Sequence, residues 1–181
     1  MKITPTPLQG ALVLEPDVFG DERGFFMESF NRRELAEQAG ITADFVQDNH
    51  SRSGRGVLRG LHYQILQPQG KLVRVVAGSV FEVMVDLRRS SPTFGRWHGV
   101  ELSAANRRMV WVPPGFAHGF LTLSDSADFL YKTTDYYAPQ HQRAVLWNDP
   151  RIGIDWPLDG KPILSDKDRD AEPLTDAELF D

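Results

Sequence analysis

Two stretches of the sequence combine residues that proton transfer next to a carbonyl group requires. The first runs Arg59-Gly60-Leu61-His62-Tyr63-Gln64 and is followed by Gly70-Lys71. An arginine can bind an anion, a histidine can accept a proton near neutral pH, and a lysine can neutralise a developing oxyanion. The second stretch, Pro113 to His118, adds another histidine directly after a turn. These residue types suit an enzyme site if the two stretches converge in space.

Convergence of Arg59 and His62 depends on the backbone between them. If Val57 to Gln64 is a regular strand, its side chains alternate, and Arg59 and His62 point to opposite faces. A bulge or bend at Gly60 would bring both side chains to one site. We therefore predict a distorted strand at Gly60.

Each candidate also has a structural explanation. A lone histidine is more often a hydrogen-bonded structural residue than a catalyst, and Lys71 could be a solvated charge at a strand end. Tyr131 could line a core with its hydroxyl at the rim, and Asp168 could be a solvated carboxylate of the acidic C-terminal stretch. An aspartate beside a catalytic histidine, however, fixes its tautomer and stabilises the imidazolium.

Aromatic residues are concentrated near the N-terminus. Phe19, Phe25 and Phe26 are expected in a core, but beside Arg23 they could also stack on a nucleobase. Turn residues followed by this aromatic run predict a strand before Phe30.

Composition narrows the class of protein. The chain has 181 residues, 41% of them hydrophobic, which suits one sizeable core, and we expect a single domain over residues 1–181. The net charge of -5 argues against nucleic-acid binding. There is no Cys, which excludes disulfides and thiolate metal sites and favours a reducing cytoplasm. No run approaches the roughly 20 apolar residues of a membrane-spanning helix, so no membrane contact is expected.

The pattern of the chain predicts an all-β fold. Asn31, with Glu34 three residues later, starts one predicted helix that Gly40 ends. After Gly54, short runs rich in Val, Leu, Phe and Trp are separated by Gly, Pro and Asn, which is typical of strands in a sandwich or barrel. The predicted strands are Val57 to Gln64, Lys71 to Ala77, Ser79 to Leu87, Trp97 to Leu102, Arg108 to Val112, Phe116 to Leu123 and Phe129 to Thr134. Ala77-Gly78-Ser79 and Ala104-Ala105-Asn106 are predicted to be hairpin connections, and the chain after Tyr136 is predicted to be irregular.

Six motifs together closely resemble the dTDP-4-dehydrorhamnose 3,5-epimerase family. They are Arg59-Gly60-Leu61-His62-Tyr63-Gln64, Gly70-Lys71-Leu72-Val73-Arg74, Val85-Asp86-Leu87-Arg88, Pro113-Pro114-Gly115-Phe116-Ala117-His118-Gly119-Phe120, Tyr131-Lys132-Thr133-Thr134 and Leu164-Ser165-Asp166-Lys167-Asp168. The resemblance implies a cupin-type jelly roll and a homodimer that exchanges N-terminal strands. It also implies action on a dTDP-4-keto-6-deoxy sugar of the L-rhamnose pathway.

The same resemblance implies roles for individual residues. His62 is similar in position to the proton acceptor, paired with Asp168, and Tyr131 to the proton donor; Lys71 would hold the enolate oxygen. The implied substrate contacts are Arg23, Phe26, Glu28, Gln47, Asp48, Asn49, Arg59, His118 and Lys167, with Arg23 and Glu28 serving the partner's site. Many relatives have an acidic residue near Gln142, so a contact there is not expected. The chemistry requires no redox or metal cofactor.

Three alternatives stay open at this point. A metal-dependent cupin would place two histidines six and eight residues after Gly78, where this chain has Met84 and Asp86. A non-catalytic nucleotide-sugar binder would not require His62, Asp168 and Tyr131 together. A related enzyme that epimerises one centre, or moves the keto group, would share most of the proton-transfer chemistry.

Overall fold

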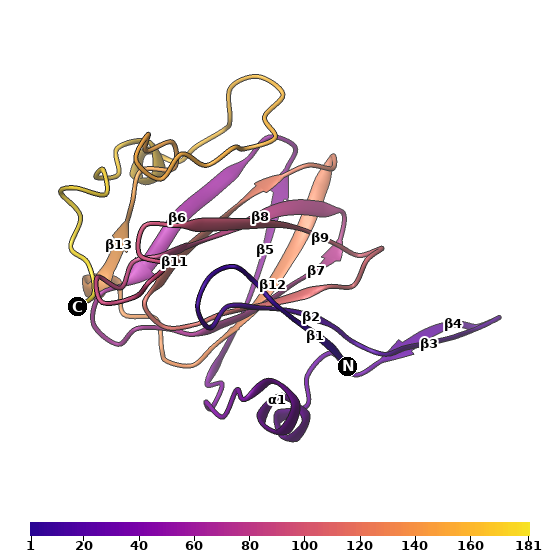
Figure 1. The fold of residues 1–181 in the computed structure, drawn as a ribbon. Coiled ribbons are helices and arrows are strands. Elements are labelled where there is room, and N and C mark those ends of the chain that lie inside the picture. Colours follow the sequence, from indigo (N-terminus) through magenta and orange to yellow (C-terminus); the bar gives the residue numbers. More distant parts are fainter.

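The computed structural model describes residues 1–181 as two antiparallel sheets stacked face to face, with two short helices and a projecting hairpin (Figure 1). The six-stranded sheet has the order β1-β2-β10-β7-β12-β5, and the five-stranded sheet has the order β13-β6-β11-β8-β9. The strands of the six-stranded sheet are β1 (Lys2–Pro5), β2 (Leu12–Glu15), β10 (Met109–Val112), β7 (Lys71–Ala77), β12 (Ser126–Thr133) and β5 (Gln47–Gly54). Those of the five-stranded sheet are β13 (Gln142–Ala144), β6 (Leu58–Gln64), β11 (Phe116–Thr122), β8 (Ser79–Asp86) and β9 (Trp97–Ser103). The remaining elements are β3 (Val18–Asp21), β4 (Gly24–Met27), α1 (Arg32–Ala39), η1 (Pro139–His141) and α2 (Asp166–Arg169).

Consecutive strands mostly lie in opposite sheets. From β5 to β12 the chain changes sheet at every connection except the one between β8 and β9. This alternation makes the fold a jelly roll of the cupin type, so the predicted fold class is confirmed.

Two predicted hairpin connections are wrong. Ala77-Gly78-Ser79 joins β7 to β8, and Ala104-Ala105-Asn106 joins β9 to β10, and each pair of strands lies in different sheets. The local sequence does specify a tight turn at Gly78, where φ is +71° and a Cβ would lie 2.0 Å from the Ser126 carbonyl oxygen. A turn signal, however, does not tell which sheet the next strand joins, because that depends on distant strands.

Most predicted elements agree with the structure. β7 covers the predicted range, and Asn31 caps α1 by accepting hydrogen bonds from the backbone N–H groups of Arg33 and Glu34. Gly40 ends this helix with φ of +67°. β5 was not predicted because its sequence is almost entirely polar, and only β12 supplies a neighbouring strand for it.

The main core lies between the sheets. Its thirteen buried residues are Leu8, Ala11, Val73, Val75, Val80, Met84, Leu102, Val110, Val112, Phe116, Phe120, Ala127 and Phe129. Eleven of them come from inward-facing positions of both sheets, as alternation requires, and Leu8 and Ala11 come from the loop between β1 and β2. The interior is therefore apolar except at one end, where the candidate site lies.

The C-terminal segment covers the outer face of the five-stranded sheet. The chain after Tyr136 was predicted to be irregular, but it contains β13, η1 and α2 between irregular stretches. Within it, Ile152 and Trp156 pack on the outward residues of β6, β8 and β11. The Tyr63 hydroxyl donates a hydrogen bond to the Glu178 carbonyl oxygen. This cover holds α2 against β6.

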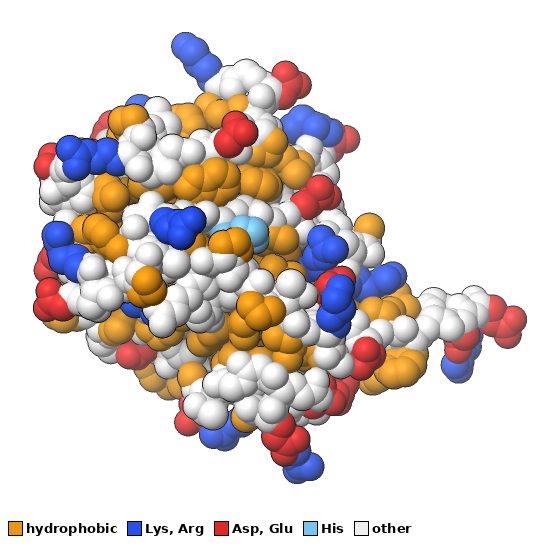
Figure 2. Space-filling model, viewed as in Figure 1, with side chains coloured by type: hydrophobic (Ala, Val, Ile, Leu, Met, Phe, Trp, Pro, Cys, Tyr) orange, Lys and Arg blue, Asp and Glu red, His pale blue; other side chains and the backbone are white.

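The hairpin of β3 and β4, which we call the arm, projects away from both sheets (Figure 1). Phe19, Phe25 and Phe26 on the arm are exposed to 66%, 57% and 67%. Hydrophobic side chains gather where the arm leaves the body of the molecule, and charged side chains lie at its tip (Figure 2). The predicted strand is confirmed, but within one chain these phenylalanines have no core to enter.

Neither helix combines the length and apolar character that crossing a bilayer requires.

Candidate active site

β6 is bulged at Gly60, as the sequence predicted. His62 pairs with His118 of β11, whereas Arg59 pairs with Phe120, so β6 contains one residue more than β11 over this interval. Gly60 has φ of +134°, and a Cβ there would lie 2.6 Å from the Gly119 Cα atom. Only glycine fits this conformation and this close approach of two backbones.

The bulge brings Arg59 to the interior side of β6. Its Nε donates to the Ser53 hydroxyl of β5 at 2.9 Å. Its charge also acts on Tyr131, whose pKa is raised by burial and by Tyr137 and lowered in part by Arg59. His118, which is opposite His62 and has its ring centroid 6.2 Å from that of Tyr131, connects these residues into one site.

His62 is held by a carboxylate. Its Nε2 forms a hydrogen bond with Asp168, a residue of α2 that is 3% exposed. Burial raises the pKa of Asp168, but the hydrogen bond from His62, the His62 charge, Ser165 and Lys167 outweigh burial and lower it. Asp168 is thus ionised at neutral pH, holds a proton on Nε2 and leaves Nδ1 of His62 free to accept one.

Helix α2 positions this carboxylate. The Ser165 hydroxyl donates to Asp168 Oδ2 at 2.8 Å and accepts from the Asp168 backbone N–H. This helix was not predicted from the sequence. A serine followed three residues later by an acidic residue is a capping pattern that could have revealed it.

The facing sheet contributes Lys71 and Tyr131. Lys71 lies in β7 and is 5% exposed; burial lowers its pKa to about 8, although the charge of Glu82 opposes this shift. Tyr131 lies in the adjacent β12, and its raised pKa keeps the phenol protonated at neutral pH. A cation and a proton donor therefore lie across the interior from His62.

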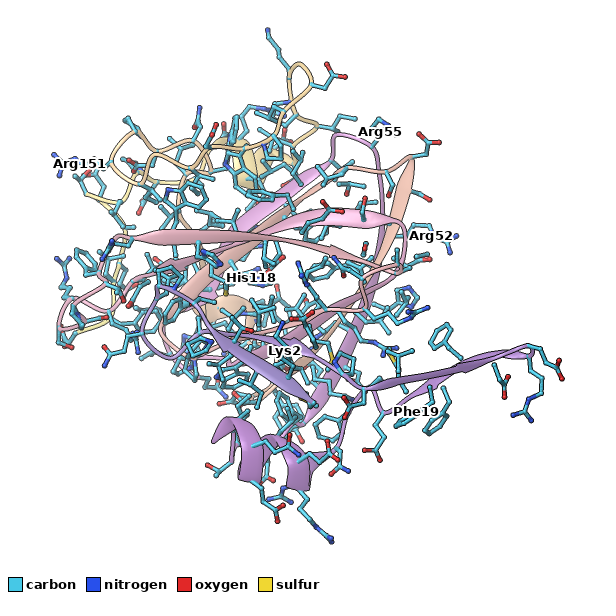
Figure 3. The ribbon with its side chains drawn as sticks, turned by 45° about the vertical axis from the view of Figure 1, so that its right-hand side comes forward. Lys2, Phe19, Arg52, Arg55, His118 and Arg151 are labelled. Carbon is cyan, nitrogen blue, oxygen red and sulfur yellow. The ribbon has the colours of Figure 1, made fainter.

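His118 lies deep between the sheets (Figure 3). Its Nδ1 is 2.8 Å from Oε1 of Glu82, a β8 residue with no exposed surface. Burial, Lys71 and His62 lower the pKa of His118 well below its usual range, whereas burial raises the pKa of Glu82 well above its own, against the Lys71 charge. Glu82 was not among the residues predicted from the sequence. Alternation along β8 places it on the inward face with Val80 and Met84, and a charged residue there is the signal that could have found it.

The predicted contacts on β5 divide between its two faces. Asn49 is opposite Tyr131, and Gln47 is opposite Thr133, so both point inward. Asp48 points outward instead and pairs with Lys132 at 2.9 Å, because alternate residues of a strand face opposite sides. The structure therefore does not bring Asp48 to this chain's own site.

Two further positions lie at the C-terminal rim: Lys167, a predicted contact, and Gln142, where no contact was expected. Lys167 is next to Asp168 on α2 and is exposed, so it can reach a ligand at the opening. Gln142 in β13 accepts a hydrogen bond at 2.7 Å from the Tyr137 hydroxyl.

Arg23, Phe26 and Glu28 do not join the site within one chain. Arg23 is at the tip of the arm and bonds to Asp21, while Glu28 accepts a hydrogen bond from Asn31. Figure 3 shows Phe19 on the same arm, far from His118. Within one chain, the structure therefore does not bring these three predicted contacts to His62.

The positions that bind metal in metal-dependent cupins have other functions here. Met84 is buried in the main core, and the Asp86 carboxylate accepts hydrogen bonds from Arg88, Ser91 and Thr93. No group of three or more His, Asp or Glu side chains converges in a way that could hold a metal ion.

One cavity of about 240 Å³ lies elsewhere, on the outer face of the six-stranded sheet. Its lining residues are Ser29, Asp48, Asn49, His50, Leu72, Arg74, Met109, Leu130, Tyr131 and Lys132. Most of these side chains point away from His62, so we do not place the chemistry there.

A carboxylate-held histidine and a protonated tyrosine on opposite walls of a cupin-type jelly roll are the arrangement of an epimerase, an isomerase that inverts a carbon centre by proton transfer. The comparisons with known proteins name the family. The family model described as dTDP-4-dehydrorhamnose 3,5-epimerase matches residues 5–176, and the chain belongs to this family.

Individual relatives agree over the full length. The dTDP-4-dehydrorhamnose 3,5-epimerase of Pseudomonas aeruginosa is 59% identical over 180 residues, covering 99% of each chain. A crystal structure of the Legionella pneumophila enzyme in complex with dTDP-4-keto-L-rhamnose has a TM-score of 0.97 and 53% identity, covering 99% of this chain and 97% of that one. A 3'-monoepimerase from Streptomyces bikiniensis in complex with dTDP-quinovose is more distant, at 37% identity and a TM-score of 0.88 over 94% of this chain and 87% of that one.

Proposed function

We propose that the protein inverts C3 and C5 of dTDP-4-keto-6-deoxy-D-glucose to give dTDP-4-keto-L-rhamnose, a step of dTDP-L-rhamnose biosynthesis. One observation carries the proposal: His62, held by Asp168, lies on one sheet, and Tyr131 lies on the facing sheet. Facing sheets are about 10 Å apart, which leaves room for one sugar ring between base and acid.

The ketone at C4 makes the protons on both C3 and C5 acidic. His62 Nδ1 can therefore accept a proton from each centre in turn, leaving the electron pair in an enolate whose charge is on the C4 oxygen. Tyr131 then returns a proton from the opposite face, and the centre is inverted. Before the second centre reacts, His62 passes its proton to water and the Tyr131 phenolate takes one up, so both groups return to their starting states.

Cationic groups complete the site. The Lys71 ammonium stabilises the enolate oxygen in a buried, weakly screened setting. Arg59 and Lys167 lie nearer the opening and bind the diphosphate, while Gln47 and Asn49 bind polar groups of the substrate. Binding energy from the nucleotide then fixes the sugar against the base.

The arm supports a homodimer with exchanged N-terminal strands. Three exposed phenylalanines would each contribute roughly 1.5–3 kcal/mol when buried against a second chain. The partner's arm would deliver Arg23 and Glu28 to the diphosphate and Phe26 to the nucleobase. We place this dimer in the cytoplasm, consistent with a chain that has no Cys, and treat each chain as a single domain.

Reaction in deuterated water tests the function. Incubation with dTDP-4-keto-6-deoxy-D-glucose should introduce deuterium at both C3 and C5 and yield the L-configured product. Deuterium at C3 alone would instead indicate a 3'-monoepimerase, the activity of the Streptomyces bikiniensis relative. No deuterium at either carbon would contradict the proposal.

A further inference from the structure

Glu82 is a buried acid for which the proposed proton transfers have no role. It is one of the largest side chains with no exposed surface, and it lies among apolar residues of β8. Burying a carboxyl group costs several kcal/mol unless a partner compensates. Its Oε1 has one partner, His118 Nδ1 at 2.8 Å, and its Oε2 has none.

His118 and Lys71 form a pair of unused donors beside this acid. His118 Nε2 makes no hydrogen bond within the chain, because the only contact of the ring nitrogens is that of Nδ1 with Glu82. Lys71 is almost fully buried and yet forms no ion pair within the chain, although its charge reaches both His118 and Glu82. Two buried donors without acceptors are suited to an anionic oxygen.

We propose that Glu82 is a positioning residue: it holds His118 by Nδ1 so that the Nε2–H group, beside the Lys71 ammonium, donates to the enolate oxygen at C4. Glu82 Oε1 and His118 Nδ1 share one proton in this arrangement, and His118 Nε2 stays protonated whichever of the two atoms carries the shared proton. On Glu82 Oε1, it is donated to Nδ1, and the neutral imidazole carries its own proton on Nε2. On Nδ1, it makes an imidazolium, which also carries a proton on Nε2.

The surroundings favour the neutral form. His118 faces four titratable groups: Glu82 of β8, Lys71 of β7, His62 of β6 and Tyr131 of β12. The charges of Lys71 and His62 disfavour a charged imidazole at His118. Burial raises the pKa of Glu82 and lowers the pKa of His118, so the shared proton stays on the carboxyl group. A buried carboxylic acid kept neutral for hydrogen bonding is an established way to support an oxyanion site.

The inference rests on the proposed function for the identity of the oxyanion, but the state of His118 can be measured without turnover. Nitrogen-15 NMR of the full-length protein, with His118 assigned by its loss in His118→Asn, should show a protonated Nε2 between about pH 6 and 8. An unprotonated Nε2 would overturn the proposal, even if the substrate proved to be different.

Kinetics of Glu82→Gln test the role in the reaction. The substitution conserves shape but lets the side-chain amide donate or accept, so the position of the imidazole proton is no longer fixed. We expect kcat to fall about 10- to 100-fold, less than the roughly 10²–10³-fold loss on removing an oxyanion donor outright. The dissociation constant for dTDP, which has no keto sugar, should change less than about twofold. A large loss of dTDP binding would assign His118 to the diphosphate and overturn the proposal, as would an unchanged kcat.

A double variant separates positioning from packing. If Glu82 acts only through His118, Glu82→Gln should lower kcat no further in a His118→Asn background. Full additivity of the two losses would mean that Glu82 supports the fold rather than His118, and the proposal would fail.

Discussion

At the scale of single residues, we expect the charge of Lys71 to limit the reaction at alkaline pH. Burial lowers its pKa to about 8, and the proposed role requires the protonated ammonium. The charge is present below this pKa and lost above it. Tyr131 does not titrate in the same range because its pKa is raised from an already high value.

We therefore expect kcat to fall as the pH rises through about 8. Lys71→Met should lower kcat by roughly 10²–10³-fold and remove this alkaline limb. Lys161→Met, which removes an exposed lysine from a C-terminal loop, is the matched control. It should leave kcat and its fall at alkaline pH unchanged. A wild-type rate that stays level from about pH 7 to 9 would contradict the role given to Lys71.

His62 and Tyr131 should fail at different steps. With His62→Ala no carbanion forms, so neither isotope exchange nor product is expected. With Tyr131→Phe the base and Lys71 remain, and deuterium should still enter unepimerised substrate while inverted product falls sharply.

NMR of the recovered sugar distinguishes these outcomes, with Tyr136→Phe as a control for loss of an exposed hydroxyl. If a folded Tyr131→Phe variant loses exchange as well as product, Tyr131 is not the acid.

At the scale of elements, the bulge in β6 decides where the base lies. β6 and β11 approach so closely at Gly60 and Gly119 that neither position has room for a Cβ atom. The strand is thereby offset by one residue between Arg59 and His62, which turns both toward the site. The geometry of the site thus depends on a contact between two backbones.

Gly60→Ala should therefore reduce both stability and turnover. Overpacking of this kind costs about 1–3 kcal/mol in the free energy of unfolding, and a displaced β6 would also move His62. Gly56→Ala is the control: its φ of +75° is also unfavourable for alanine, by about 1 kcal/mol, but nothing lies within 4 Å of the new Cβ.

Urea denaturation and kcat/KM of both variants check this expectation. Equal losses of activity in the two would mean that the bulge does not position the base.

At the scale of the whole molecule, the arm lies apart from the rest of the chain. Arg23, Phe26 and Glu28 lie on or beside a hairpin that extends into solvent (Figures 1 and 2), although the family resemblance places them at a substrate. Arg74 near the base of the arm has a buried guanidinium nitrogen without a partner, in a hollow that Phe25 and Phe26 also line. Both features are explained if a second chain packs against this region.

Mixing two inactive variants tests exchange of the arms. Arg23→Ala removes the arm's cation, and His62→Ala removes the base. A mixed dimer then holds one site with an intact base and an intact partner arm. Random exchange makes half of the dimers mixed, each with one working site of two, so about a quarter of wild-type activity should return.

In the control, Arg23→Ala is mixed with the double variant Arg23→Ala/His62→Ala instead of His62→Ala. The double variant supplies no intact arm, so no activity should return. An absence of recovery after mass spectrometry has verified subunit exchange would show that each site uses only its own chain.

The sequence by itself determined the chemistry available and the class of fold. Strand-like runs, a capped helix from Asn31 to Gly40 and the glycine at position 60 are local signals, and each acts over a few residues. The motif residues His62 and Tyr131 could likewise be identified as a base and an acid from their resemblance to a family.

Only the tertiary structure decided which of these side chains meet. His62 and Asp168 are 106 residues apart, and His118 and Glu82 are 36 apart, so their contacts depend on the register and sheet assignment of distant strands. For the same reason the turn at Gly78 was recognised but its sheet was not, and Asp48 was expected at the site although its strand turns it outward. Local sequence sets the conformation of a segment, whereas its neighbours are set by packing of the whole chain, where the burial of apolar faces outweighs local preference.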